Sequence, residues 1–81
     1  MKIYKHNGKC NVSGEKIREN REKLGISQEQ LAAKLQLLGL DTNQKAISRV
    51  ETGSRVVPDY ELEYYSKALG ISILVLLNQE N

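Results

Sequence analysis

The sequence predicts an all-α fold, a compact bundle of four to five helices within one domain. Two observations support this prediction. Apolar residues recur at helical spacing in successive segments, and capping residues, glycines and a proline stand where those segments should begin and end. A chain of 81 residues can bury about 60% of its unfolded surface, which suffices for a single core. We therefore expect helices packed around one core and no convincing strand.

The first helix follows a basic arm. Residues 1–13 (MKIYKHNGKCNVS) mix glycine, asparagine and lysine with little periodicity, so we interpret them as an N-terminal arm that precedes a helical domain of residues 14–81. Ser13 can cap the first helix, which should run to about Leu24, before Gly25.

The second helix has complete signals at its start. Ser27 can cap it, Gln30 stands three residues further on as the partner of a capping box, and Ile26 and Leu31 flank the cap as a hydrophobic staple. Leu31 and Leu35 then fall on one face, which should be buried.

The third helix separates an apolar stripe from a polar face. Ile47 and Val50 define the buried stripe, and Gly53 is expected to end the helix in a left-handed conformation. The opposite face is cationic and rich in hydrogen-bond donors, as expected of a helix that enters a DNA groove. Its members are Lys45, Arg49 and Thr52, with Ser48 on the flank.

Two further helices should complete the bundle. The fourth opens around Pro58 and Asp59 and ends at Gly70, and a last short helix should cover residues 72–78. The apolar segment at residues 71–77 (ISILVLL) either seals the core or is partly exposed as a homodimer interface.

Two charged residues point partly into the expected core. Arg21 shares a stripe with Ile17, and Glu51 adjoins the stripe of Ile47 and Val50. An unpaired buried charge is costly, so we predict that Arg21 and Glu51 form a largely buried ion pair that ties the first helix to the third. The alternative is that both side chains reach water separately.

The net charge of +2 hides an asymmetry along the chain. Residues 1–56 carry eleven lysines and arginines against six acidic residues, whereas residues 57–81 carry one against four. One end of the domain should therefore be basic, which suits a polyanionic partner.

The composition argues against several other classes of protein. Cys10 is the single cysteine, so no internal disulfide can form, and with only His6 nearby the chain has too few ligands for a zinc site. No nucleophile, base and orienting group can be assembled, so we expect no enzyme, cofactor, metal or small-molecule ligand. No apolar run has signal-peptide or membrane-spanning length, and we expect a cytoplasmic protein.

The sequence resembles a known family over about residues 14–77. The segments IRENREKLGISQEQLAAKL, AISRVETGSR and SKALGIS are similar to the phage-repressor-like helix-turn-helix family, the xenobiotic-response-element type of bacterial regulator. The resemblance implies a lambda-repressor-like DNA-binding domain of four or five helices, in which the residues at the positions of Arg21 and Glu51 commonly pair. Its anchors are Arg21, Gln28, Leu31, Ala32, Ile47, Glu51, Gly53, Ala68, Leu69 and Gly70.

The chain departs from this family in the turn between the second and third helices. The spacer QLLGLDT is about five residues longer than the usual short turn. We expect the second helix to continue through Leu38 and to break at Gly39. Asp41 and Gln44 could form a capping box one turn early, but counting back from the buried stripe favours Asn43 as the cap of the third helix.

The resemblance also implies roles for individual residues. Gln28 corresponds to a residue that approaches the DNA backbone and an outer base. Arginine and lysine can satisfy guanine O6 and N7, and glutamine can pair with adenine, so the base-reading candidates are Gln44, Lys45, Ser48 and Arg49. The phosphate-contact candidates are Ser27, Asn43, Thr52 and Arg55.

The sequence therefore predicts sequence-specific binding of double-stranded DNA by a transcriptional repressor or regulator. Such a protein would act as a homodimer on an inverted repeat, with residues 71–77 as a candidate interface. The arm could add phosphate or minor-groove contacts through Lys2, Lys5 and Lys9, or could equally be a disordered tail. The alternative is an antitoxin or another protein-interaction module built on the same bundle.

Overall fold

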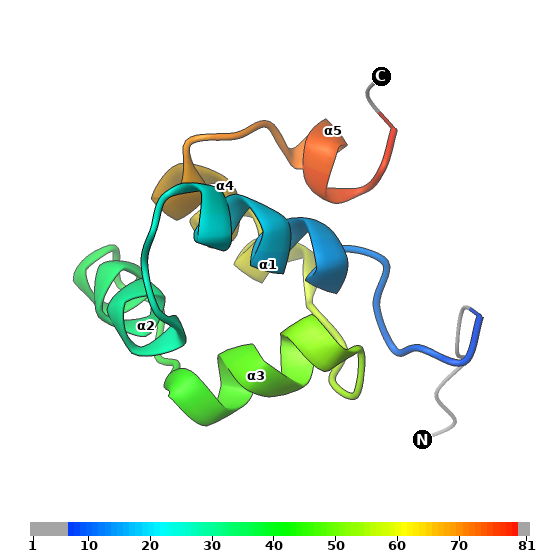
Figure 1. Ribbon diagram of the computed structural model, residues 1–81, viewed down its shortest axis with the longest axis horizontal. Coiled ribbons are helices and arrows are strands. Elements are labelled where there is room, and N and C mark those ends of the chain that lie inside the picture. Colours follow the sequence, from blue (N-terminus) through cyan, green and yellow to red (C-terminus); the bar gives the residue numbers. More distant parts are fainter. Residues whose placement is uncertain (1–6, 80–81) are drawn as a thin grey trace.

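The computed structural model describes residues 7–79, and these residues form five α-helices without a strand (Figure 1). The prediction of an all-α bundle of four to five helices is therefore confirmed. The helices are α1 (Gly14–Lys23), α2 (Gln28–Leu37), α3 (Gln44–Thr52), α4 (Asp59–Leu69) and α5 (Ile73–Leu76).

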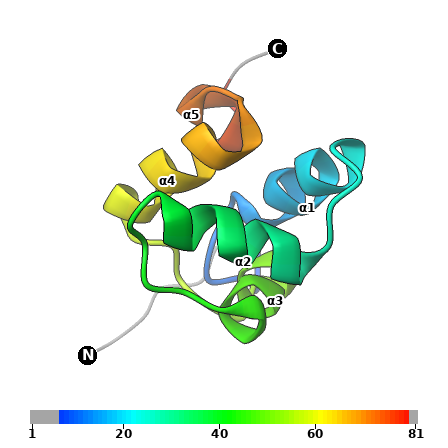
Figure 2. The same cartoon turned by 90° about the vertical axis from the view of Figure 1, so that its left-hand side faces the viewer.

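The helices surround one apolar core. α1 packs against α3, α4 and α5, while α2 packs against α3 and α4. In Figure 1, α3 and α5 lie on opposite sides of α1 and α4, and the turned view of Figure 2 shows α2 beside α3. Every helix contributes to the buried apolar residues, which are Ile17, Leu31, Ala32, Leu35, Leu40, Ile47, Val50, Leu62, Tyr65, Ala68, Leu69 and Leu76.

The starts of α2 and α3 are capped by the expected side chains. Ser27 Oγ accepts a hydrogen bond from the Gln30 backbone N–H (3.0 Å), and Gln30 Oε1 accepts one from the Ser27 N–H (2.8 Å), which completes the capping box. Asn43 Oδ1 accepts from the Ala46 N–H (2.9 Å). Asn43, rather than Asp41, is therefore the cap of α3.

The expectation that the Ser13 side chain caps α1 is wrong. Ser13 occupies the cap position, but its backbone is already helical and its buried side chain makes no capping bond. A side-chain cap requires an extended backbone at that position, because only then does the hydroxyl turn back over the first N–H groups. Asn11 supplies the bond instead, since its Oδ1 accepts from the Gly14 N–H (2.8 Å).

The long turn between α2 and α3 is held at two points. α2 ends immediately before Leu38, which is its C-cap, and Gly39 follows with a φ of +105°. Leu40 is buried in the core, and Gln36 Nε2 donates to the Thr42 carbonyl (2.7 Å). The extra residues therefore form an anchored turn.

The C-terminal segment seals the core and also exposes one leucine. α5 is shorter than the predicted span of residues 72–78, and Ser72 Oγ accepts from the Val75 N–H at its start (3.3 Å). Leu76 is fully buried, whereas Leu74 is 54% exposed. The prediction that the segment seals the core is thus confirmed for Leu76, whereas the homodimer interface stays a prediction. None of the helices in the described part of the chain has the length and apolar character needed to cross a membrane.

Candidate nucleic-acid interface

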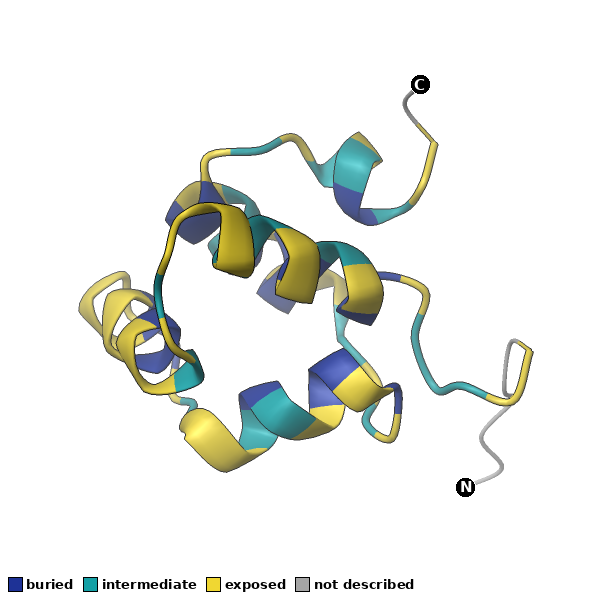
Figure 3. Cartoon of the chain, viewed as in Figure 1, coloured by how far each residue is buried: buried dark blue, intermediate teal, exposed yellow. Residues whose placement is uncertain are grey.

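α3 presents its polar face away from the bundle. Ile47 and Val50 are fully buried, which fixes the rotation of the helix about its axis. Lys45 and Arg49 consequently lie exposed, with Ser48 half-buried beside them, and Figure 3 shows this outward side of α3 as exposed and intermediate. Among residues 7–79, the side chains of Lys45 and Arg49 have no hydrogen-bond or ion-pair partner. Both cations are therefore available to an external ligand.

A buried ion pair between Arg21 and Glu51 holds the inner side of α3 against α1. Arg21 Nε donates to Glu51 Oε2 (2.8 Å) and Arg21 Nη2 donates to Glu51 Oε1 (3.0 Å), while Nη1 donates to the Ile26 carbonyl (2.9 Å). The two side chains are 13% and 3% exposed. The hydrogen bonds to Glu51 raise the pKa of Arg21 above its ordinary value, so the guanidinium stays charged. This pair joins α1, α3 and the start of α2.

Two glutamines extend the buried pair to the surface. Gln28 Nε2 donates to Glu51 Oε1 (3.0 Å), and Gln44 Nε2 donates to Gln28 Oε1 (2.6 Å). Because the carboxylate accepts from the Gln28 amide nitrogen, the Gln28 oxygen is left to face Gln44. The carbonyl oxygen of the Gln44 side chain, and one N–H of its amide, stay available for an external ligand.

The N-termini of α2 and α3 adjoin each other. Gln28 and Gln44 are the first residues of these helices, and their side chains are hydrogen-bonded. The caps Ser27 and Asn43 therefore stand next to two positive helix ends, an arrangement that favours a phosphate group. At the other end of α3, Thr52 is exposed and its Oγ1 donates to the Arg49 carbonyl (3.2 Å).

Arg55 has a partner that the sequence interpretation missed. Its Nη1 donates to Glu61 Oε1 (2.9 Å) and its Nη2 to Glu61 Oε2 (3.3 Å), with the Arg55 side chain 35% exposed and Glu61 buried. Hydrogen bonding to Glu61 raises the pKa of Arg55. A signal existed, because Glu61 stands one residue before Leu62 and four before Tyr65, both of which are buried. Glu51 has the reverse spacing, one residue after Val50 and four after Ile47.

We expect Arg55→Ala to weaken binding of all DNA sequences alike and also to destabilise the fold. The binding loss follows from removal of a cation that is close to α3, and the stability loss, about 1 to 3 kcal/mol, follows from leaving buried Glu61 without its charged partner. Urea denaturation and DNA titration would measure the two effects separately. A double-mutant cycle with Glu61→Gln serves as the control, and a coupling energy near zero would contradict the assigned pairing.

Part of the N-terminal arm lies against the C-terminal end of α3. Lys2 and Lys5 fall outside the described residues, whereas Lys9 pairs with Glu15, and the Cys10 N–H donates to the Gly53 carbonyl (2.7 Å). The hydrogen bond from Lys9 lowers the pKa of the Glu15 carboxyl. Lys9 is therefore next to the C-terminal end of α3, but its charge is shared with a carboxylate.

The adjoining helices α2 and α3, with the exposed cations Lys45 and Arg49 on the outer face of α3 and Glu51 held behind it, have the arrangement of a helix-turn-helix DNA-binding domain. The sequence model described as helix-turn-helix matches residues 17–76. The chain belongs to the phage-repressor-like helix-turn-helix family, and it is a DNA-binding transcriptional regulator.

A solved structure supports this assignment. The fold is similar to that of the P22 c2 repressor protein in complex with synthetic operator 9T in the presence of Tl+, with a TM-score of 0.72 and 32% sequence identity. The match covers 85% of this chain and 97% of that chain. No curated protein matches the chain.

Proposed function

We propose that this protein is a sequence-specific transcriptional repressor or regulator that binds double-stranded DNA as a homodimer on an inverted repeat. The observation that carries the proposal is the outward face of α3, where Lys45 and Arg49 have no partner within residues 7–79 while the rear of the helix is fixed by Glu51. The similar P22 c2 repressor, whose structure was solved in complex with a synthetic operator, supports the DNA-binding part of the proposal.

In this proposal, the first two turns of α3 read bases. Arg49 and Lys45 would donate to guanine O6 and N7, Gln44 would use the free part of its amide on adenine, and Ser48 would serve either kind of base. Gln28 would approach an outer base and the backbone from the start of α2. Its double engagement with Glu51 and Gln44 reduces the entropy that DNA binding must remove.

Phosphate contacts would flank the base-reading residues on both sides. Ser27 and Asn43 would act together with the backbone N–H groups of the adjoining helix ends, and Thr52 and Arg55 would act at the far end of α3. Lys9 would act next to that end, and Lys2 and Lys5 of the arm would add further phosphate or minor-groove contacts. These contacts would fix register without reading sequence.

Dimerisation would place two copies of α3 in successive major grooves about 34 Å apart. Leu74, exposed on α5, makes residues 71–77 the candidate surface for a second copy. Occupancy of an operator, in the cytoplasm, would then be the regulatory event.

Selection from random duplexes tests this proposal. We expect enrichment of an inverted repeat, weaker binding to a duplex that contains only one half-site, and an affinity that falls steeply with salt. A motif without inverted symmetry would contradict the homodimer. Absence of any enriched motif, with a flat salt response, would overturn DNA reading and favour the antitoxin or protein-interaction alternative.

A further inference from the structure

The segment just before α1 closes over the C-terminal end of α3. The carboxamide of Asn11 makes three hydrogen bonds: Nδ2 donates to the carbonyls of Val50 (3.0 Å) and Arg55 (2.7 Å), and Oδ1 accepts from the Gly14 N–H (2.8 Å). The Cys10 N–H adds the bond to the Gly53 carbonyl. Three segments, α1, α3 and the α3–α4 loop, therefore meet at one side chain.

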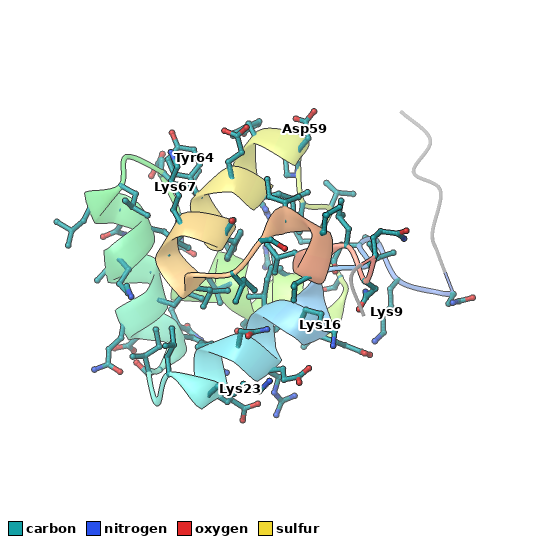
Figure 4. All side chains as sticks on the ribbon, turned by 90° about the horizontal axis from the view of Figure 1, so that it is seen from above. Lys9, Lys16, Lys23, Asp59, Tyr64 and Lys67 are labelled. Carbon is teal, nitrogen blue, oxygen red and sulfur yellow. The ribbon has the colours of Figure 1, made fainter. Side chains whose placement is uncertain are left out.

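The backbones at this junction are in direct contact. A β-carbon placed on Gly14 would lie 2.1 Å from the Val50 carbonyl oxygen, and one placed on Gly53 would lie 2.8 Å from the Lys9 side chain. Figure 4 shows Lys9 near the start of α1, where it pairs with Glu15. The last turn of α3 thus has no space in which to tilt toward α1.

This junction complements the two other anchors of α3. Gln28 holds its first residue and Arg21 holds Glu51, but both of these contacts come from one side, through α2 and the end of α1. Asn11 is bonded to Val50, the direct neighbour of Arg49. Loss of this bond would remove one of the contacts that hold the last turn of α3, next to Arg49.

We propose that Asn11 is a positioning residue, which sets the tilt of α3 and so the angle at which Arg49 meets a base. The inference rests on the proposed DNA-reading function. Asn11 itself need not touch DNA. Its effect would be on discrimination between sequences, because a small displacement of Arg49 disrupts a two-bond contact with guanine more than a contact with phosphate.

Asn11→Asp separates this role from helix capping. The variant keeps an oxygen for the Gly14 N–H and so retains the cap of α1, but it replaces the two donors with an acceptor that faces the carbonyls of Val50 and Arg55. Asn78→Ala is the matched control for Asn11→Ala, since Asn78 Nδ2 also donates to a carbonyl, that of Val12 (2.8 Å), and within residues 7–79 Asn78 makes no hydrogen bond to α3.

The measurement is the ratio of dissociation constants on random and selected duplexes, at a temperature well below the melting point of each variant. We expect Asn11→Asp to lower this ratio about tenfold or more, the scale of one lost base contact, and Asn78→Ala to leave it unchanged. The added negative charge weakens binding to both duplexes and so cancels in the ratio. Asn11→Ala should show the same loss without the added charge.

Hydrogen exchange of the free protein supplies a second readout. We expect Asn11→Asp to accelerate exchange of the Cys10 amide, which Gly53 protects, while the Leu31 amide of α2 keeps its protection. An unchanged discrimination ratio, together with a lower melting temperature, would show Asn11 to be structural only and would overturn the inference. A wild-type protein that selects no motif would overturn the proposed function itself, before any variant is compared.

Discussion

Replacing Glu51 with glutamine is expected to lower the free energy of unfolding by about 3 to 5 kcal/mol, the usual cost of removing one partner of a buried ion pair. Glutamine has the shape of the carboxylate, so the loss arises from the uncompensated guanidinium of Arg21, which is only 13% exposed. Gln28 would also lose its charged acceptor. Urea denaturation followed by circular dichroism measures this change.

Glu29→Gln is the matched control for this substitution. Glu29 lies exposed in the first turn of α2, where the same chemical change should alter stability by no more than about 0.5 kcal/mol. If the Glu51 variant lost no more than this control, the pair would contribute no more than a solvent-exposed ion pair does. Replacement of both Arg21 and Glu51 by apolar residues should be less harmful than removal of either alone.

Replacing Arg49 with alanine is expected to cost about 1 to 3 kcal/mol of binding free energy and to relax sequence preference at one base pair. Stability should hardly change, since the Arg49 side chain is exposed and unpartnered within residues 7–79. Affinity for duplexes with each single-base change, measured by fluorescence anisotropy at fixed salt, gives both quantities.

Arg18→Ala provides the comparison for Arg49. Arg18 is also an exposed arginine, but it lies on α1 and pairs with Glu22. We expect its loss to affect every duplex equally and weakly. Equal losses for Arg49→Ala on specific and random DNA would remove Arg49 from the base-reading residues.

The sequence predicted the features that depend on local patterns. Ser27 with Gln30, and the stripe of Ile47 and Val50, are read within one or two helical turns, so the helices and the outward face of α3 follow from them. The meeting of Arg21 with Glu51 could be anticipated because each charge shared a stripe with apolar residues.

The missed features depend on contacts between distant segments. Asn11 bonds to carbonyls about forty residues away, and backbone carbonyls carry no signature in the sequence. The failure of Ser13 as a cap has the same origin, because tertiary packing selects its helical backbone conformation. The burial of Leu40 was also missed, because the sequence analysis described the spacer only by its length.

The polar chain from Arg21 to Gln44 divides the residues of the proposed DNA-binding surface by how freely they could change in evolution. Gln28 and Gln44 are tied through Glu51 to the stability of the fold, so substitution at either position disturbs both folding and recognition. Lys45 and Arg49 are exposed, and within residues 7–79 their side chains make no hydrogen bond or ion pair that stabilises the fold. Under the proposed function, exchanging these two residues would therefore change the recognised operator while leaving the fold intact, whereas the residues of the polar chain would be constrained by stability as well.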